Sequence, residues 1–419
     1  MSGGKLLERL KELETEMSRT QRNKSTEYHL GQLKAKVAKL RTQILEGSSA
    51  GGAAAGVGFD VQKTGHARVA MIGFPSVGKS TLLTKLTGTE SVAAAYEFTT
   101  LTCVPGNLYH KGTKIQVLDL PGIIEGASQG KGRGRQVIAV AKSSDLVIIM
   151  LDAAKEQEKN HRAILEHELE TVGIRLNRAP PQIYFRRQKT GGIKFSSMVP
   201  LTRLGPDPQH TVETILREYR LHNSEVLFRE DCGVDDLIDV IEGNRKYVAA
   251  LYVWNKADTV SIEDVDRLSR QPHSIVVAAS ADLNLDRLIE KIWEYLSLTR
   301  VYTKRRGEGP DFEEPVVLTA GRHGVSVESL CTQIHRSLAQ DFKYAIVWGS
   351  STKHSPQHVG LAHMLQDEDV VQIMKKTNAE QKAEKDYGAR VQAHFDKLKG
   401  KVSGSGKSTR DGKKAPLRS

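Results

Sequence analysis

Gly73-Phe74-Pro75-Ser76-Val77-Gly78-Lys79-Ser80 matches the phosphate-loop pattern G-x-x-x-x-G-K-[ST]. The apolar residues 69–72 before it predict a strand, and a helix is predicted from Thr81 onward. Two glycines let backbone N–H groups turn toward an anion, while Lys79 reaches the terminal phosphates and Ser80 offers a hydroxyl to Mg²⁺. The order of strand, loop and helix therefore predicts an α/β fold with a nucleoside triphosphate site.

Two later motifs indicate which nucleotide binds. The apolar strand predicted at 115–118 ends in Asp119-Leu120-Pro121-Gly122, where the carboxylate can hold Mg²⁺ through water and the glycine N–H can meet the γ-phosphate. The apolar run 249–254 ends in Asn255-Lys256-Ala257-Asp258. A carboxylate there accepts two hydrogen bonds that guanine offers and adenine does not, so the site rejects the wrong base. Together the three motifs predict a GTP site.

Two further segments are assigned to the same site. The strand predicted at 275–278 leads into Ala279-Ser280-Ala281, whose backbone N–H groups can hold the guanine carbonyl. Between the phosphate loop and the second motif lies Phe98-Thr99-Thr100-Leu101, a segment that can close over Mg²⁺ when the γ-phosphate is present. We assign the metal contact to Thr100, with Thr99 as the alternative. Either threonine alone fits an ordinary strand-edge hydroxyl equally well.

The predicted site combines these assignments. Lys79, Thr100 and Gly122 are assigned to catalysis, and Ser80, Thr100 and Asp119 to the metal. Nucleotide contacts are assigned to Gly73, Phe74, Pro75, Ser76, Val77, Gly78, Lys79, Ser80, Thr81, Asp119, Gly122, Asn255, Lys256, Asp258, Ala279, Ser280 and Ala281.

Composition and charge bound the class of protein. A chain of 419 residues predicts two to four domains, and 39% apolar residues suffice for buried cores. The net charge of +11 favours a polyanionic partner, nucleic acid more than membrane. Cys103, Cys232 and Cys331 are far apart, which indicates neither a disulfide framework nor a zinc site. We expect a cytoplasmic protein, because no apolar run approaches 18 residues and charges begin at Lys5.

The N-terminal residues 1–46 predict a helical hairpin. Apolar residues recur at three- and four-residue spacing in two stretches: Leu6, Leu10, Leu13 and Met17, and Leu30, Leu33, Val37, Leu40 and Ile44. We expect the two seams to pack on each other rather than on an outside helix, with Arg19, Arg22 and Lys24 at the turn. Residues 47–65, rich in glycine, alanine and serine, predict a flexible linker into a GTPase domain at 66–299.

An inserted subdomain is predicted at 172–246. About a hundred residues separate the buried strand at 146–151 from the strand at 249, where a simple alternating unit needs roughly 30. Ile183–Arg187 and Ile193–Phe195 flank a glycine pair and predict a β-hairpin, followed by helices near 212–219 and 234–240. The aromatic and basic residues at 184–189 fit RNA binding and a half-buried hairpin face equally well.

The C-terminal part divides into a folded segment at 300–376 and a basic tail at 377–419. Strands are predicted at 315–319, 345–348 and 370–373, with a helix at 327–338. Its five histidines lack ligand spacing and are interpreted as surface or packing residues: His323, His335, His354, His358 and His363. From Asn378 onward 11 Lys or Arg stand against 5 Asp or Glu, which fits a polyanion contact or a solubilising tail.

Several sequence blocks, in this order, resemble the Obg branch of GTPases, and most closely the developmentally regulated GTP-binding proteins: GFPSVGKST, YEFTTLTCVPG, DLPGIIEGASQGKGRGRQVIAVA and NKAD. Residues 17–24, 58–61 and 342–349 are similar to type 1 members of that family. The resemblance covers residues 5 to 376. It implies an insertion like domain 2 of ribosomal protein S5, a ubiquitin-like TGS domain, association with translating ribosomes and a regulatory partner protein that contains a zinc finger.

The expected activity is Mg²⁺-dependent GTP hydrolysis by in-line attack of water. Loss of the γ-phosphate would release the switch segments 97–104 and 123–135. Ile123 stands where Ras-like enzymes carry a water-orienting glutamine, so we expect slow intrinsic turnover. Relatives can use K⁺ as an extra charge through an asparagine that corresponds to Ser76 here. The alternative function is a ribosome- or RNA-binding scaffold whose GTP site is structural.

Overall fold

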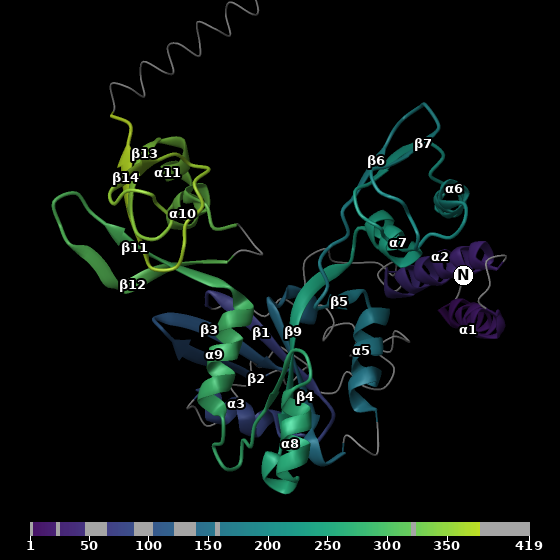
Figure 1. Ribbon diagram of the computed structural model, residues 1–419, viewed down its shortest axis with the longest axis horizontal. Helices are drawn as coiled ribbons and strands as arrows, with labels where there is room; N and C mark the ends of the chain where they lie inside the picture. The colour runs from purple at the N-terminus through teal and green to yellow at the C-terminus, as the bar shows by residue number, and fades with distance from the viewer. Residues whose placement is uncertain are drawn as a thin grey trace, which may run out of the picture. The chain divides into compact units, whose positions relative to one another are not determined.

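The computed structural model describes residues 3–21, 26–46, 65–87, 104–120, 140–155, 160–319 and 324–377 (Figure 1). The chain forms two compact units, which divide between Leu298 and Thr299. Nearly all of the predicted linker at 47–65 and of the basic tail at 377–419 lies outside the described residues, as do Arg22 and Lys24 of the predicted turn. None of the helices in the described ranges combines the length and apolar character that a membrane span requires.

The first unit is built on a sheet with the strand order β10-β9-β4-β1-β3-β2. These strands are β1 (Ala67–Gly73), β2 (Val104–His110), β3 (Thr113–Asp119), β4 (Leu146–Asp152), β9 (Lys246–Asn255) and β10 (Ser274–Val276). Only β2 runs antiparallel to its neighbour within this path. All residues of β1 and β4 are buried, as expected for parallel strands covered on both faces, and this is why residues 69–72 and 146–151 appear in the sequence as continuous apolar runs.

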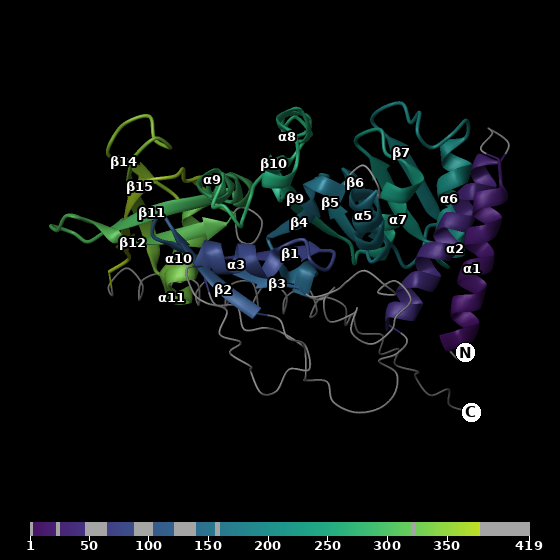
Figure 2. The ribbon, with the colours of Figure 1, turned by 90° about the horizontal axis from the view of Figure 1, so that it is seen from below.

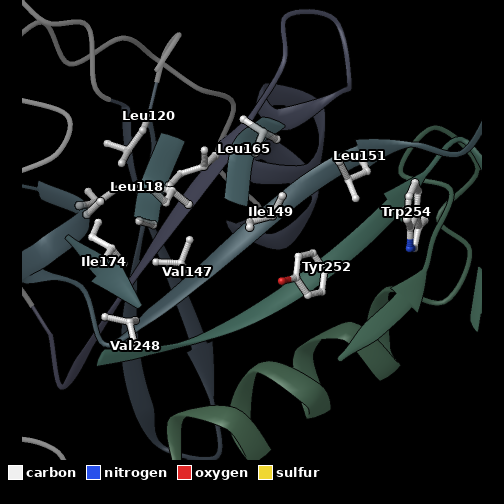
Figure 3. Close-up of a cluster of buried hydrophobic side chains, with 14 of the residues drawn as sticks. Leu118, Leu120, Val147, Ile149, Leu151, Leu165, Ile174, Val248, Tyr252 and Trp254 are labelled. Carbon is white, nitrogen blue, oxygen red and sulfur yellow. The ribbon is translucent and has the colours of Figure 1, made fainter. Parts of the chain in front are cut away.

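Helices cover both faces of this sheet. On one face α5 (His161–Thr171) and α8 (Ile262–Ser269) contribute Leu165 and Leu268 to a core with Ile149, Tyr252 and other strand residues (Figure 3). The helices α3 (Lys79–Thr87) and α9 (Leu285–Leu296) pack on the same strands through residues outside that cluster, so they occupy the opposite face. The result is a doubly wound α/β domain.

The insertion leaves this sheet later than predicted. β5 (Ile174–Leu176) still pairs with the start of β9, so the chain departs after Leu176, not at 172, and returns at Lys246. It then forms β6 (Ile183–Arg187), β7 (Ile193–Ser197), β8 (Ser224–Phe228), α6 (Pro208–Glu218) and α7 (Val234–Glu242). Asp207 caps α6 by accepting a hydrogen bond from the His210 N–H, and Pro208 opens the helix.

The predicted β-hairpin at 183–195 is wrong. The sheet order is β6-β8-β7, so β8 lies between the two strands, antiparallel to β6 and parallel to β7. The local alternation of apolar residues is correct, but it does not specify which strand is the neighbour. The backbone of β8 completes the pairing on both sides, beginning where the Gln188 N–H donates to Asn223 O and the Ser224 N–H to Gly192 O.

A buried ion cluster joins the insertion to the GTPase sheet. Asp239 of α7 is 5% exposed and accepts two hydrogen bonds from Arg175 of β5, at 2.7 and 2.8 Å. The same carboxylate accepts a hydrogen bond from the Arg245 Nε at 3.1 Å. Removing one partner of such a buried cluster would leave charges unpaired, at a cost of about 3–5 kcal/mol. The insertion is therefore fixed to the strands that enter and leave it.

The N-terminal helices are α1 (Gly3–Arg19) and α2 (Glu27–Glu46), and they pack on each other as predicted. The expectation was incomplete, because α2 also packs on α6 and α7 of the insertion (Figure 2). Ala35 and Ala38 belong to the insertion's core, and Lys34 pairs with Asp235 at 2.7 Å. Small residues at four- and three-residue spacing let the helices approach closely on this second side.

The second unit is a five-stranded sheet with the order β12-β11-β15-β13-β14 and two short helices. Its elements are β11 (Leu298–Lys304), β12 (Pro310–Thr319), α10 (Val327–Ile334), α11 (Arg336–Gln340), β13 (Phe342–Trp348), β14 (Gln357–Val359) and β15 (Asp369–Lys375). The helix predicted at 327–338 breaks at His335, whose ring accepts a hydrogen bond from the Ser337 N–H and caps α11. His358 stacks on Tyr344, a packing role.

Candidate functional site

The predicted GTP-site motifs meet at one edge of the first sheet. The strand register places Met71 beside Asp119, Gly73 beside Met150, and Asp152 beside Asn255. The carboxyl ends of β1, β3, β4 and β9 therefore lie at the same level. In open α/β sheets this edge is where ligands bind, so the fold explains why residues distant in sequence share one site.

The phosphate loop has the backbone geometry of an anion cradle. Ser76 and Gly78 have positive φ angles of 65° and 94°, which turn successive N–H groups toward one side. A Cβ at Gly78 would lie 2.3 Å from the Asn255 Nδ2, and one at Gly73 would lie 2.6 Å from the Met150 carbonyl oxygen. Close packing therefore requires glycine at both positions, and at Gly78 the positive φ favours glycine as well.

Lys79 begins α3 and bends back over the loop. Its Nζ donates to the carbonyl oxygens of Gly73 and Phe74, at 3.0 and 3.1 Å. Burial lowers the pKa of Lys79, and the nearby Asp119 carboxylate acts in the opposite direction. The ammonium group is held at the mouth of the loop by two neutral carbonyls, which an anionic ligand can outcompete.

Ser80 and Asp119 form a second polar pair beside the loop. The Ser80 Oγ donates to the Asp119 Oδ2 at 3.1 Å. Burial raises the pKa of Asp119, while Lys79 and the Ser80 hydroxyl lower it by smaller amounts. The Asp119 Oδ1 is buried without a hydrogen-bond partner within the described part of the chain. A buried carboxylate oxygen without a partner can accept a hydrogen bond from a ligand or coordinate a cation.

Asn255 ties the two halves of the site together. Its side chain is buried, with Nδ2 donating to the Val77 carbonyl oxygen at 2.8 Å and Oδ1 accepting from the Ala279 N–H at 3.0 Å. The Ala279 N–H, predicted to face guanine, therefore meets Asn255 instead. Ser280, Ala281 and Asp258 are exposed. The asparagine thus positions the phosphate loop and the 279–281 segment relative to each other.

Sequence reasoning missed Asp152, which lies at the end of β4. This residue is 3% exposed; its Oδ2 accepts from the Lys256 Nζ at 2.7 Å, and its Oδ1 accepts from the Ala154 N–H at 3.1 Å. Lys256 has a positive φ of 66°, so the pair holds a left-handed residue inside the guanine motif. The sequence shows that a carboxylate ends a buried strand, but only the strand register places this carboxylate at the level of Asn255.

The remaining predicted site residues divide into two groups. Phe74 packs against His161 with ring centroids 4.2 Å apart and the rings tilted by 32°, while Pro75 of the loop and Thr81 of α3 are exposed. Thr99, Thr100, Gly122 and Ile123 lie outside the described residues. Two of the three residues assigned to catalysis therefore stay predictions.

The doubly wound sheet, the anion cradle on β1 and the asparagine-anchored motif on β9 define a phosphate-loop GTPase domain. Residues 68–185 match the family described as 50S ribosome-binding GTPase, 190–298 match the family described as C-terminal region of MMR_HSR1 domain, and 299–375 match the TGS domain. The chain therefore combines a GTP-binding GTPase domain with a TGS domain, and the resemblance that predicted both is confirmed.

Individual relatives define the family of this chain more narrowly than the domain matches do. Developmentally-regulated G-protein 2 of Arabidopsis thaliana is 63% identical, over 88% of this chain and 92% of the relative. Developmentally-regulated G-protein 1 of the same plant is 61% identical, over 92% and 94%. The solved Schizosaccharomyces pombe YchF GTPase is 12% identical, covers 75% of this chain and 99% of its own, and has a TM-score of 0.38, which adds nothing to the assignment.

The chain belongs to the family of developmentally regulated GTP-binding proteins. Relatives numbered 1 and 2 match it almost equally, which identifies the family without separating type 1 from type 2.

Proposed function

We propose that this GTPase is a Mg²⁺-dependent switch that acts in translation by associating with ribosomes or RNA. The observation that carries the proposal is the convergence, at one sheet edge, of a phosphate cradle, a hydroxyl–carboxylate pair and a guanine-type motif. The association with ribosomes or RNA is supported by the net charge of +11 and by the 11 basic residues of the tail.

The donor set suits Mg²⁺. Ser80 and Asp119 supply a hydroxyl and a carboxylate oxygen next to the cradle, and the Asp119 Oδ1 has no partner within the described ranges. Hard oxygen ligands of this kind, together with substrate phosphates, are what Mg²⁺ prefers. These two residues, with Thr100 as the third predicted ligand, would hold the ion. When bound, it neutralises charge on the β- and γ-phosphates.

Hydrolysis then depends on what the protein positions around the γ-phosphate. Lys79 exchanges its two carbonyl partners for phosphate oxygens, and the cradle N–H groups of the loop bind the rest. Attack by water is in line with the leaving oxygen. Ile123 cannot hydrogen-bond that water, so the isolated chain turns over slowly. The K⁺ route used by relatives would have Ser76 in place of its asparagine ligand.

The switch itself follows from the predicted contacts of Thr100 and Gly122. Both lose their partner when the γ-phosphate leaves, and the segments 97–104 and 123–135 relax. We further propose a cytoplasmic location, as expected from the lack of an apolar run near 18 residues, and a regulatory partner containing a zinc finger, which the family resemblance implies. An activating group supplied by this partner or by the ribosome would compensate for Ile123.

Single-turnover hydrolysis of Mg·GTP tests the proposal. Rates are compared in K⁺ and Na⁺, with and without ribosomes. A slow basal rate that ribosomes raise, by as much as about 10³- to 10⁵-fold, is the expected result. Tight GTP binding with no hydrolysis under any condition would instead support the alternative, a ribosome- or RNA-binding scaffold with a structural GTP site. A fast rate that no addition changes would contradict the incomplete-site mechanism.

A further inference from the structure

The insertion's three-stranded sheet has one covered face and one open face. Ile183 and Phe185 of β6, with Val226 and Phe228 of β8, join the core formed with α6 and α7. The alternate residues of the same strands point the other way, because side chains alternate along a strand. Tyr184 and Arg186 are both exposed, so they lie on the open face. The sequence fits a half-buried face and an RNA-binding surface equally well for this stretch. In the structure, Ile183 and Phe185 account for the buried face, and the exposed face with Tyr184 remains open to a ligand.

The strand register defines the layout of the open face. Arg186 of β6 and Lys194 of β7 lie on either side of Glu225 in the central strand. In the next row, Tyr184 and Ser196 lie on either side of Leu227. We call this set the open face: Tyr184, Arg186, Lys194, Ser196, Glu225 and Leu227. Because β8 separates β6 from β7, the face is three strands wide, roughly 10 Å between the outer strands.

The open face carries more positively than negatively charged side chains, and it has one aromatic ring. Its two cations, Arg186 and Lys194, face a single carboxylate, and Gln188 shares that carboxylate by donating to the Glu225 Oε2 at 2.9 Å. Beyond the end of β6, Lys189 is a further exposed cation. Tyr184 is 42% exposed although it is a large aromatic residue. An exposed ring one row from two exposed cations matches a polyanion that also carries flat apolar groups.

We infer that the open face binds unpaired RNA, with phosphates at Arg186 and Lys194 and a base stacked on Tyr184. Single-stranded nucleic acid offers both groups at once, since its bases are free to stack on an aromatic ring. A duplex hides its bases in the stack and would use only the charges. The inference rests on the proposed association with ribosomes or RNA and assigns that association to a surface.

Two sets of variants separate the two kinds of contact. Tyr184→Ala removes the platform, and Tyr184→Phe keeps a ring of the same shape. Arg186→Ala/Lys194→Ala removes two charges from the open face. The matched control, Arg270→Ala/Arg287→Ala, removes two charges from exposed positions on α8 and α9. Thermal unfolding and GTP affinity of each full-length variant, unchanged from the wild type, show that the fold is intact.

Binding is measured by fluorescence anisotropy, across a salt series, with a labelled oligouridylate of about 12 nucleotides and an RNA duplex of equal length. We expect Tyr184→Ala to weaken oligouridylate binding about 5- to 150-fold without changing the salt slope, and Tyr184→Phe to restore it. The double charge variant should reduce the slope by about 1.4, which is 0.7 for each lost phosphate contact. The control should do neither.

Ribosome co-sedimentation with the same variants separates the possible failures. If the wild type binds neither ribosomes nor oligouridylate, the proposed association itself is wrong. If it binds both and the open-face variants bind equally well, the association survives and the assignment to this surface is overturned. If the variants lose ribosomes but keep oligouridylate, the face contacts ribosomal protein and the RNA inference is also overturned.

Discussion

The nucleotide edge of the GTPase sheet and the open face of the insertion's sheet present polar groups in opposite ways. At the nucleotide edge, Asn255 and Asp152 are buried and already hydrogen-bonded to the protein. On the open face, Tyr184, Arg186 and Lys194 are exposed to water. The first arrangement fixes geometry before the ligand arrives, whereas the second leaves geometry to be adjusted on binding.

The difference has energetic consequences. A buried residue with two partners cannot be changed without leaving those partners unsatisfied, so single substitutions have large, non-additive effects. Exposed cations act nearly independently and are screened by salt, so their effects are small, additive and dependent on ionic strength. Four predictions test this contrast.

The largest effect is expected on base selectivity. Asp258→Asn should change the preferred nucleotide from GTP to xanthosine triphosphate. The introduced amide can donate a hydrogen bond to the carbonyl that replaces guanine's amino group in xanthine. The change in the ratio of the two affinities should approach about 10⁴. Calorimetric titration with both nucleotides measures it, and Asp282→Asn, another exposed carboxylate near the 279–281 segment, is the control. Full retention of GTP selectivity would place base recognition elsewhere.

Lys79→Ala should weaken GTP binding by about 30- to 5,000-fold, which corresponds to the roughly 2–5 kcal/mol lost when a desolvated charge contact is removed. The control, Lys85→Ala, changes a lysine on the same helix that pairs with Asp282 at 2.7 Å. Both variants should keep the wild-type circular dichroism spectrum. Equal GTP affinities for the two would refute the role of Lys79.

Asp152→Asn should have an intermediate effect. The amide can still accept from the Ala154 N–H, but Lys256 loses its anionic partner. We expect the affinities for GTP and for GDP to fall by the same factor, about three- to tenfold, because the lysine of the ion pair is partly exposed. The single-turnover rate should not change. A double-mutant cycle with Lys256→Met should show coupling. Additive losses of GTP affinity in that cycle would mean that Asp152 does not act through Lys256.

The smallest effect is expected from a gain of charge on the open face. Ser196→Lys places a third cation one row from Lys194 and should raise the salt slope of oligouridylate binding by about 0.7. GTP affinity should not change. Ser269→Lys, at an exposed position on α8, serves as the control for added charge. A slope that rises equally for both variants would show that position on the face is irrelevant.

Much of the GTPase core could be predicted from the sequence because its strands are buried on both faces. Residues 69–72 and 146–151 appear as uninterrupted apolar runs, and the first of them ends at the phosphate loop, a motif that needs the sheet edge. The order β6-β8-β7 could not be predicted, since alternation fixes a strand's faces and not its neighbour. The second side of α2 was missed because Ala35 and Ala38 are small and carry little hydrophobic signal.

The motifs predicted that Lys79, Ser80 and Asp119 lie together, and the structure shows the contacts of Lys79 with the loop and of Ser80 with Asp119, while the roles of these residues stay predictions. Asp152 belongs to no motif that we considered, and its role depends on strand register, which sequence does not display. The use of the Ala279 N–H by Asn255 also required the tertiary contact. Thr100 and Gly122 stay predictions.

The position of the insertion between β5 and β9 affects how the chain is made. Synthesis runs from the N-terminus, so β1, β3 and β4, which carry the phosphate cradle, leave the ribosome well before β9 and β10. The ribosome must add about 130 residues to extend the chain from Asp152 to Ala281. At 5–20 residues per second this synthesis takes about 6–26 s. During that interval a nascent chain has its phosphate-binding half without the guanine motif. Selective GTP binding can begin only after the insertion has been completed and β9 has joined β4.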